Sequence, residues 1–172
     1  VLAAMGVPIL TMAGYEADDI LGTIAKRCQA EGEEVSVVSG DRDLLQLSDT
    51  HIKIRIPKTS RGTTEIHDYY PEDVKREYQV TPTEFIDVKA LMGDTSDNIP
   101  GVPSIGEKTA TNLIVAYGSI ENAYAHLDEV KPPRAKKALE EHYDLAVMSK
   151  ELAEICITCP IPFEYEEARI EN

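Results

Sequence analysis

Seven carboxylate side chains stand in three short clusters along the chain. Two clusters follow short apolar runs, and the third follows a predicted helix. The members are Glu16, Asp18, Asp19, Asp41, Asp43, Asp94 and Asp97. Carboxylates that converge on one place repel one another unless a cation lies between them. Hard oxygen ligands suit Mg²⁺ or Mn²⁺, and two such ions about 4 Å apart can stabilise both the attacking and the leaving oxygen in phosphodiester hydrolysis.

The same carboxylates also have a simpler interpretation. Asp and Glu are common at helix N-termini, because they cap the helix and interact favourably with its dipole. The Asp41-x-Asp43 pair does not belong to an EF-hand loop, since no Gly or closing Glu stands at the required positions. Residue types and spacing therefore leave two alternatives open, a divalent-metal site and a set of capping or solvated carboxylates.

A turn bracketed by glycines, Ile99 to Ala110, is the second candidate site. Gly101 and Gly106 bracket this turn, which lies between two predicted helices. The free N–H groups at the start of the second helix can face a phosphate, and Lys108 and Thr109 would add a charge and a hydroxyl. Such a turn holds the DNA backbone without reading bases. The alternative is an ordinary connection between helices with Gly for geometry.

The first seventy residues show an α/β pattern. Residues 1–6 have the composition of a helix end, and hydrophobic spacing predicts the elements that follow. The predicted order is a buried strand at 7–12, a helix at 16–30, a strand at 34–39, a short helix at 41–47 and a hairpin with strands at 52–56 and 64–67. Ligands of open α/β sheets bind beyond the carboxyl ends of strands, so we expect the first two carboxylate clusters to face each other.

Helices dominate from Pro71 onward, and two prolines stand where helix N-termini accept them. The predicted helices are 71–78, 82–92, 106–117, 119–127, 132–142 and 143–153, and residues 155–161 are expected to return as a strand. The chain thus divides into an α/β core at 1–70, a helical region at 71–153 that contains the turn 99–110, and a C-terminal segment at 154–172 that returns to the core.

Overall charge limits how this chain can bind nucleic acid. Among its 172 residues, 17 Lys and Arg stand against 31 Asp and Glu, which gives a net charge of −14. This balance excludes nucleic-acid binding by bulk positive charge, although Lys131–Lys137 forms a small basic patch. No apolar run approaches the roughly 18 residues of a membrane span, so no membrane partner is expected. The 3 cysteines are too few for a disulfide framework or a zinc site and suit a reducing compartment.

Three linked stretches carry a resemblance to a known family. They read Gly-Tyr-Glu-Ala-Asp-Asp from Gly14, Val-Val-Ser-Gly-Asp-Arg-Asp-Leu-Leu-Gln-Leu from Val37, and Gly-Asp-Thr-Ser-Asp-Asn-Ile-Pro-Gly-Val-Pro from Gly93, with Gly-Glu-Lys-Thr-Ala following from Gly106. Their order and spacing resemble the 5′→3′ exonuclease domains of bacterial DNA polymerase I, members of the flap endonuclease family. The resemblance extends over nearly the whole chain, including Ala146–Ala153.

The resemblance implies a PIN-like α/β core followed by a helical region with a helix-three-turn-helix DNA-binding motif. It implies two-metal hydrolysis of DNA at 5′ ends and 5′ flaps, in repair and Okazaki-fragment processing, by a bacterial cytoplasmic protein with polymerase domains in the same chain. It also implies that all seven carboxylates are ligands of two or more Mg²⁺ or Mn²⁺ ions. Among them, it implies that Asp18, Asp19, Asp41 and Asp43 are catalytic residues. The residues implied in duplex binding are Gly101, Val102, Ser104, Ile105, Gly106, Lys108 and Thr109. A K⁺ ion at the turn is also implied, held by backbone carbonyls and the hydroxyl of Ser104 or Thr109.

Two departures from the family pattern shape our expectations. Ser104 stands where the family usually has Gly, at a turn that favours glycine. The family's first strand with its metal-binding Asp, and its basic helical arch, have no counterpart in this sequence. We therefore expect an incomplete core, weak or no activity from this chain alone, and exposed sheet edges that favour self-association. The alternatives are a duplex-DNA-binding protein that does not cleave and a ribonuclease on the same core.

Overall fold

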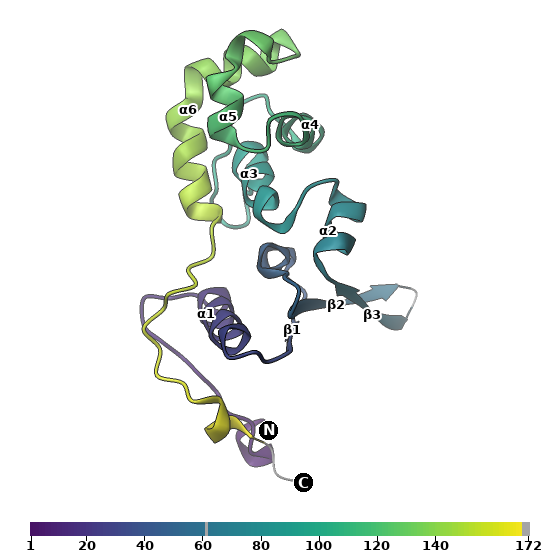
Figure 1. Ribbon diagram of the computed structural model, residues 1–172, viewed down its shortest axis with the longest axis vertical. Helices are drawn as coiled ribbons and strands as arrows, with labels where there is room; N and C mark the ends of the chain where they lie inside the picture. The colour runs from purple at the N-terminus through teal and green to yellow at the C-terminus, as the bar shows by residue number, and fades with distance from the viewer. Residues whose placement is uncertain (61, 170–172) are drawn as a thin grey trace.

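An elongated molecule with an α/β part and a helical part is seen in the computed structural model, which describes residues 1–60 and 62–169 (Figure 1). The helical part lies above the sheet in this view, and both chain ends lie below it. The two terminal segments meet where the Cys159 thiol contacts the Met12 sulfur at 3.3 Å. Short 3₁₀ helices lie within these segments, η1 at Ala3–Met5 and η4 at Tyr165–Ala168.

The sheet contains the strands β1 (Val35–Val38), β2 (Ile52–Ser60) and β3 (Thr63–Tyr69) in the order β1-β2-β3. The β1 and β2 strands pair in parallel, and β2 and β3 form the predicted antiparallel hairpin. Its predicted turn includes Arg61, which lies outside the described residues. Alternation along β2 buries Ile52, Ile54 and Ile56 on one face, as a half-exposed strand requires.

Two helical segments flank the sheet and carry the first two carboxylate clusters. Helix α1 (Ala17–Ala30) begins at Glu16 with a capping box in which the Asp19 carboxylate accepts the Glu16 N–H. The 3₁₀ helix η2 (Arg42–Leu47) begins at Asp41, whose side chain accepts the Asp43 N–H at 2.9 Å. Both helices were predicted within a residue or two, because their caps and apolar spacing are local features of the sequence.

The helical part contains α2 (Pro71–Tyr78), α3 (Pro82–Met92), α4 (Glu107–Tyr117), α5 (Ile120–Ala125), the 3₁₀ helix η3 (Leu127–Glu129) and α6 (Pro133–Ala153). Helix α3 is central, since it packs against α4, α6 and η2. Its Asp87 is buried, accepts the Ile120 N–H at 3.0 Å and pairs with Lys150 of α6 at 2.9 Å. Through these two contacts Asp87 joins α3, α5 and α6.

The strand predicted at 7–12 is wrong. Residues 7–13 form no strand, and Ile9 is 63% exposed. A strand needs a neighbouring strand to satisfy its backbone groups, and an apolar run by itself carries no information about that partner. The first carboxylate cluster consequently follows an irregular segment rather than a strand.

The strand predicted at 155–161 is also absent, because side chains of α1 take its backbone hydrogen bonds. Thr23 donates to the Cys156 carbonyl at 3.3 Å and accepts the Cys159 N–H at 3.0 Å. The Arg27 guanidinium donates to the carbonyls of Cys159 and Ile161 at 2.8 and 2.7 Å. The segment therefore lies against α1 in an irregular conformation.

The two helices predicted at 132–142 and 143–153 form the single helix α6. The boundary between them coincides with a local distortion, since His142 has a non-helical φ of −131° within α6. The predicted boundary marks this kink, but the chain continues through it as one helix, which packs against α3.

Candidate metal centre

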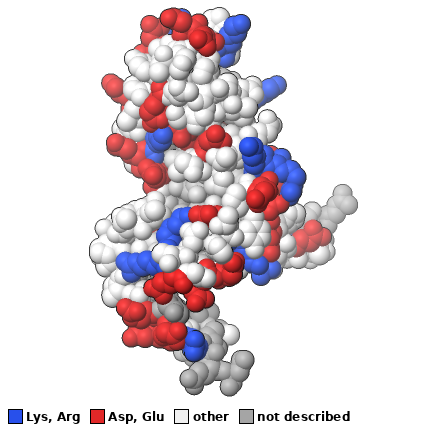
Figure 2. Space-filling view, viewed as in Figure 1, with Lys and Arg blue, Asp and Glu red and all other residues white. Residues whose placement is uncertain are grey.

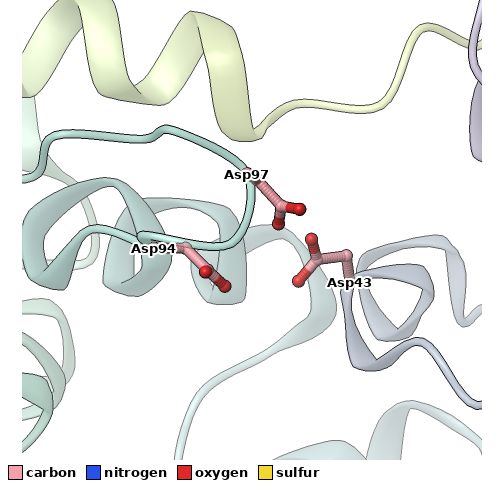
Figure 3. A group of neighbouring side chains, drawn as sticks. All are labelled: Asp43, Asp94 and Asp97. Atoms are coloured by element: carbon pink, nitrogen blue, oxygen red, sulfur yellow. The ribbon is translucent and has the colours of Figure 1, made fainter.

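Three of the seven predicted ligands, Asp43, Asp94 and Asp97, meet at one place. One carboxylate oxygen of each lies within 4.8 Å of the others, the only such group of three possible metal-ligating side chains in residues 1–60 and 62–169. Figure 3 shows Asp43 projecting from its short helix toward Asp97 and Asp94 on the loop that follows α3. Carboxylates separated by about fifty residues in the sequence are thus brought together by tertiary packing.

Asp43 is held by the helix that carries it. The next residues of η2, Leu44 and Leu45, are fully buried in the α/β core, and Leu47 is buried as well. With these side chains in the core and Asp41 capping the helix, Asp43 is left on the side that faces α3. The apolar anchors of η2 therefore fix the direction of the carboxylate.

Asp94 and Asp97 are held by a closed loop between α3 and the turn at 99–110. Asp94 and Ile99 exchange two backbone hydrogen bonds of 2.9 and 2.8 Å, and the Asp94 carboxylate accepts the Ser96 N–H at 2.8 Å. At the base of the loop, Gly93 and Gly101 both have positive φ and their backbones touch. The Gly101 N–H donates to the buried Ser149 hydroxyl of α6 at 3.0 Å, which fastens the loop to the helical part.

Lys89 of α3 lies among the three carboxylates, and sequence reasoning did not single it out. Its side chain is only 3% exposed, and its ammonium donates to Asp43 and, at 2.8 Å, to Asp97, while Asp94 lies 3.4 Å away. Its sole signal in the sequence is a charged residue within the apolar run Val-Lys-Ala-Leu-Met. Lysines in such runs are ordinarily on the exposed side of a helix, so the pattern alone gave no reason to select it.

The electrostatics of the centre follow from burial and from mutual contact. Burial acts to lower the pKa of Lys89, but its hydrogen bonds to Asp43 and Asp97 and their charges outweigh burial and raise that pKa above its ordinary value. Lys89 therefore remains protonated at neutral pH. Burial raises the pKa of Asp43 above 3.8, and the charges of Asp41 and Asp97 add to this effect, against the opposing influence of Lys89.

The other four predicted ligands are not part of this group. Asp41 caps η2, and the Asp19 carboxylate accepts the N–H groups of Glu16 and Cys156 at 3.1 and 2.8 Å. The pKa of Asp18 is raised mainly by burial, with contributions from the charges of Asp19 and Asp41. The Asp18 and Asp41 carboxylates therefore lie within electrostatic range of each other, while Asp19 and Asp41 serve as helix caps in this structure.

The turn at 99–110 leads directly from this centre into α4. Val102 and Ile105 are buried in the helical core, while Lys108 is exposed on the first turn of the helix. Ser104 has a φ of 73°, so the serine adopts the left-handed conformation that favours glycine. This conformation costs a residue with a side chain about 1 kcal/mol. Gly106, by contrast, has an extended φ of −94° and caps α4.

A cavity of about 890 Å³ connects the carboxylates with the first turns of α4. Lys89, Asp43 and Asp94 line one end, and Lys108 and Thr111 of α4 contribute to its wall. The candidate metal centre and the first turns of α4 thus border one shared space.

Positive charge is sparse on the surface. Figure 2 shows acidic side chains along the length of the molecule and basic ones only in small groups. Within the basic patch Lys131–Lys137, Lys136 pairs with Asp128 and Lys137 with Glu141. Local charges and backbone N–H groups therefore have to supply any attraction for an anionic ligand.

Comparison with known proteins gives a family match for each of the two parts of the chain. The family model described as 5′-3′ exonuclease, N-terminal resolvase-like domain, matches residues 1–79, and that described as 5′-3′ exonuclease, C-terminal SAM fold, matches residues 80–172. DNA polymerase I of Bacillus caldotenax is 46% identical over 166 residues, which is 96% of this chain and 19% of that protein. DNA polymerase I of Bacillus subtilis is 50% identical over 147 residues, 86% of this chain and 16% of that protein. The chain thus spans about a fifth of the length of these relatives.

A solved structure shares the fold. The flap endonuclease of bacteriophage T5, in a pseudo-enzyme-product complex with DNA and metal ions, superposes with a TM-score of 0.76 at 26% sequence identity. The match covers 92% of this chain and 56% of that one.

The close approach of Gly93 and Gly101 predicts a strong effect of a single methyl group. A Cβ at Gly101 would lie 2.5 Å from the Gly93 nitrogen, whereas a Cβ at Gly118 would meet nothing within 4 Å, although both glycines have positive φ. We expect Gly118→Ala to lower the free energy of unfolding by about 1 kcal/mol and Gly101→Ala by roughly 3 kcal/mol. Urea denaturation measures both, and equal losses would contradict the proposed backbone contact.

Proposed function

The chain belongs to the 5′-3′ exonuclease family, and on that premise we propose that it hydrolyses DNA phosphodiesters at 5′ ends and 5′ flaps with divalent metal ions. The observation that carries this proposal is the shared cavity, which is lined by two of the three converging carboxylates, Asp43 and Asp94, and by residues in the first turns of α4. A nuclease needs these two features next to each other, since one binds the scissile phosphate and the other binds the duplex behind it.

The donor set fits Mg²⁺ or Mn²⁺. Asp43, Asp94 and Asp97 offer hard oxygen atoms from two separate elements within one ion's reach. When bound, divalent ions lower the pKa of a water molecule for attack on phosphorus and stabilise the departing oxygen. We propose that Glu16, Asp18, Asp19 and Asp41 complete the set for a further ion, with Asp18, Asp19, Asp41 and Asp43 closest to the reaction. The raised pKa of Asp18, in part due to Asp41, supports this grouping.

The helix-three-turn-helix motif in our proposal consists of α3, the turn at 99–110 and α4. The N–H groups in the first turn of α4 would bind a duplex phosphate, and Lys108 would add a point charge there. Backbone carbonyls between Gly101 and Ile105, with the hydroxyl of Ser104 or Thr109, would bind K⁺. The buried side chains of Val102 and Ile105 support this role, because they fix the turn while Pro103 and Ser104 between them stay exposed.

We propose that the whole protein is a bacterial DNA polymerase I that carries its polymerase domains in the same chain and acts in the cytoplasm, in repair and Okazaki-fragment processing. The identity of this chain to two such polymerases supports this assignment. In the part of the chain that the structure describes, no helix is long and apolar enough to cross a membrane.

A second candidate function is duplex-DNA binding without cleavage by this chain alone. The observation that favours it is the Lys89 ammonium, which lies where a divalent ion would have to bind. In addition, four of the seven proposed ligands serve other contacts or lie apart from the group. Cleavage and binding have to be measured separately to decide between the two functions.

Removal of one ligand charge tests the nuclease proposal. In the full-length protein that contains this chain, we expect Asp43→Asn and Asp97→Asn to slow Mg²⁺-dependent cleavage of a 5′-flap duplex at least about a hundredfold, because each removes one oxygen ligand. Asp144→Asn, on the exposed side of α6, is the control and should cleave normally. Retained cleavage in both ligand variants would refute the assignment. The 172-residue chain by itself should bind the duplex and cleave it weakly or not at all.

Replacement of Lys108 tests the role of the turn. Lys108→Ala should weaken binding to duplex DNA of any sequence and reduce the slope of log Kd against log salt by about 1. Lys53→Ala removes a charge that is paired with Asp68 on the β2–β3 hairpin and is the matched control. Fluorescence anisotropy in Ca²⁺ measures both variants, and an unchanged salt slope for Lys108→Ala would exclude a phosphate contact at this residue.

We also propose that the chain self-associates. Leu2, Met5, Ile9 and Val38 are all more than half exposed, and residues 1–60 and 62–169 contain no strand that pairs with the free edge of β1. Sedimentation velocity should show a dimer that forms with increasing protein concentration, and Val38→Lys should weaken it. A monomer throughout the micromolar range would refute this proposal.

A further inference from the structure

Lys89 is the buried cation of the candidate metal centre, and its position raises a question about how ions reach the carboxylates. Its ammonium contacts Asp43 and lies 2.8 Å from Asp97 and 3.4 Å from Asp94. A buried ammonium is costly unless it is paired, and neighbouring carboxylates repel one another without a cation. The buried ammonium and the three carboxylates therefore stabilise one another.

We propose that Lys89 is a tethered counter-ion, whose ammonium occupies the place between Asp43, Asp94 and Asp97 that a divalent ion requires, so that ion binding displaces it. The inference rests on the proposed metal-dependent function and adds a residue that controls ion occupancy. In the metal-free protein Lys89 keeps the centre assembled, because it joins Asp43 of η2 to Asp97 in the loop that follows α3.

The geometry allows such an exchange. A lysine side chain is a flexible four-carbon stem with a compact charge, so the ammonium can move without a change in the helix. Lys89 also lines the 890 Å³ cavity, which gives the displaced ammonium space beside the carboxylates. A divalent ion interacts more strongly with three carboxylates than a single positive charge does. The exchange therefore favours the divalent ion. Because the ammonium has to be displaced, the centre binds this ion more weakly than the three carboxylates would without Lys89.

Replacement of Lys89 by an uncharged side chain of similar length separates the two effects. Calorimetric titration of Mn²⁺ into metal-stripped protein should show about tenfold tighter binding to Lys89→Met than to the original chain, because no ammonium has to be displaced. Without metal, the Tm of Lys89→Met should fall by roughly 5 °C, because the carboxylates are left unbalanced. Saturating Mn²⁺ should restore the Tm of this variant.

Two further variants control for charge and for side-chain shape. Lys26→Met removes one positive charge from the Lys26–Asp49 ion pair, which lies outside the group of three carboxylates, and should bind Mn²⁺ like the original chain. Lys89→Arg retains a cation at this position and should not show the gain in Mn²⁺ affinity that is expected for Lys89→Met. Equal affinity for Lys89→Met and the original chain would overturn the proposal, as would a Lys89→Met protein that saturating Mn²⁺ fails to stabilise.

A measurement on the unmodified chain tests displacement directly. The hydrogen-bonded Lys89 ammonium should give a protected ¹⁵N–¹H NMR signal in metal-free protein that is absent from Lys89→Met. This signal should shift or disappear in proportion to bound Mg²⁺, and a signal unchanged at saturation would overturn the proposal. If neither the original chain nor Lys89→Met binds Mn²⁺, the metal centre itself fails, and with it the proposed nuclease function. If only Lys89→Met binds, the ammonium blocks the centre and is not displaced, which would overturn the proposal.

Discussion

Three carboxylates around one buried ammonium are the interaction on which the arrangement of this molecule depends. Asp43 comes from the α/β part, and Lys89, Asp94 and Asp97 come from the helical part. Like charges at this distance are stable only with a cation among them, so the contact between the two parts is electrostatically coupled to whatever cation is present. Replacing the ammonium by another cation therefore changes how strongly the α/β part and the helical part are held together.

Helix α3 turns this local interaction into an organised site. Lys89 projects toward the carboxylates, and Asp87 on the same helix accepts the first N–H of α5 and pairs with Lys150 of α6. Ser149, the residue before Lys150, binds the backbone at Gly101, where the acidic loop ends and the turn begins. The carboxylate loop and the proposed DNA-binding turn therefore share one support, so a disturbance at α6 should reach both.

Local features of the sequence explain which predictions were confirmed. The helices at 71–78 and 82–92 have the bounds expected from proline and capping residues, and the alternation of Ile52, Ile54 and Ile56 predicted the central strand. The two strands predicted at 7–12 and 155–161 were wrong because strand formation depends on a distant partner. For residues 155–161 that partner is the side chains of Thr23 and Arg27, which no spacing rule indicates.

By itself the sequence determined which residues are available to the site: three acidic clusters, a glycine-bracketed turn and few basic side chains. It also determined the match to the 5′-3′ exonuclease family. Only the tertiary structure decided which carboxylates meet, because Asp43 and Asp97 lie on elements whose contact depends on core packing rather than on sequence separation. It also decided the place of Lys89. A lysine in an apolar helix can be exposed or buried, and burial is possible here because three carboxylates from two parts of the fold surround it.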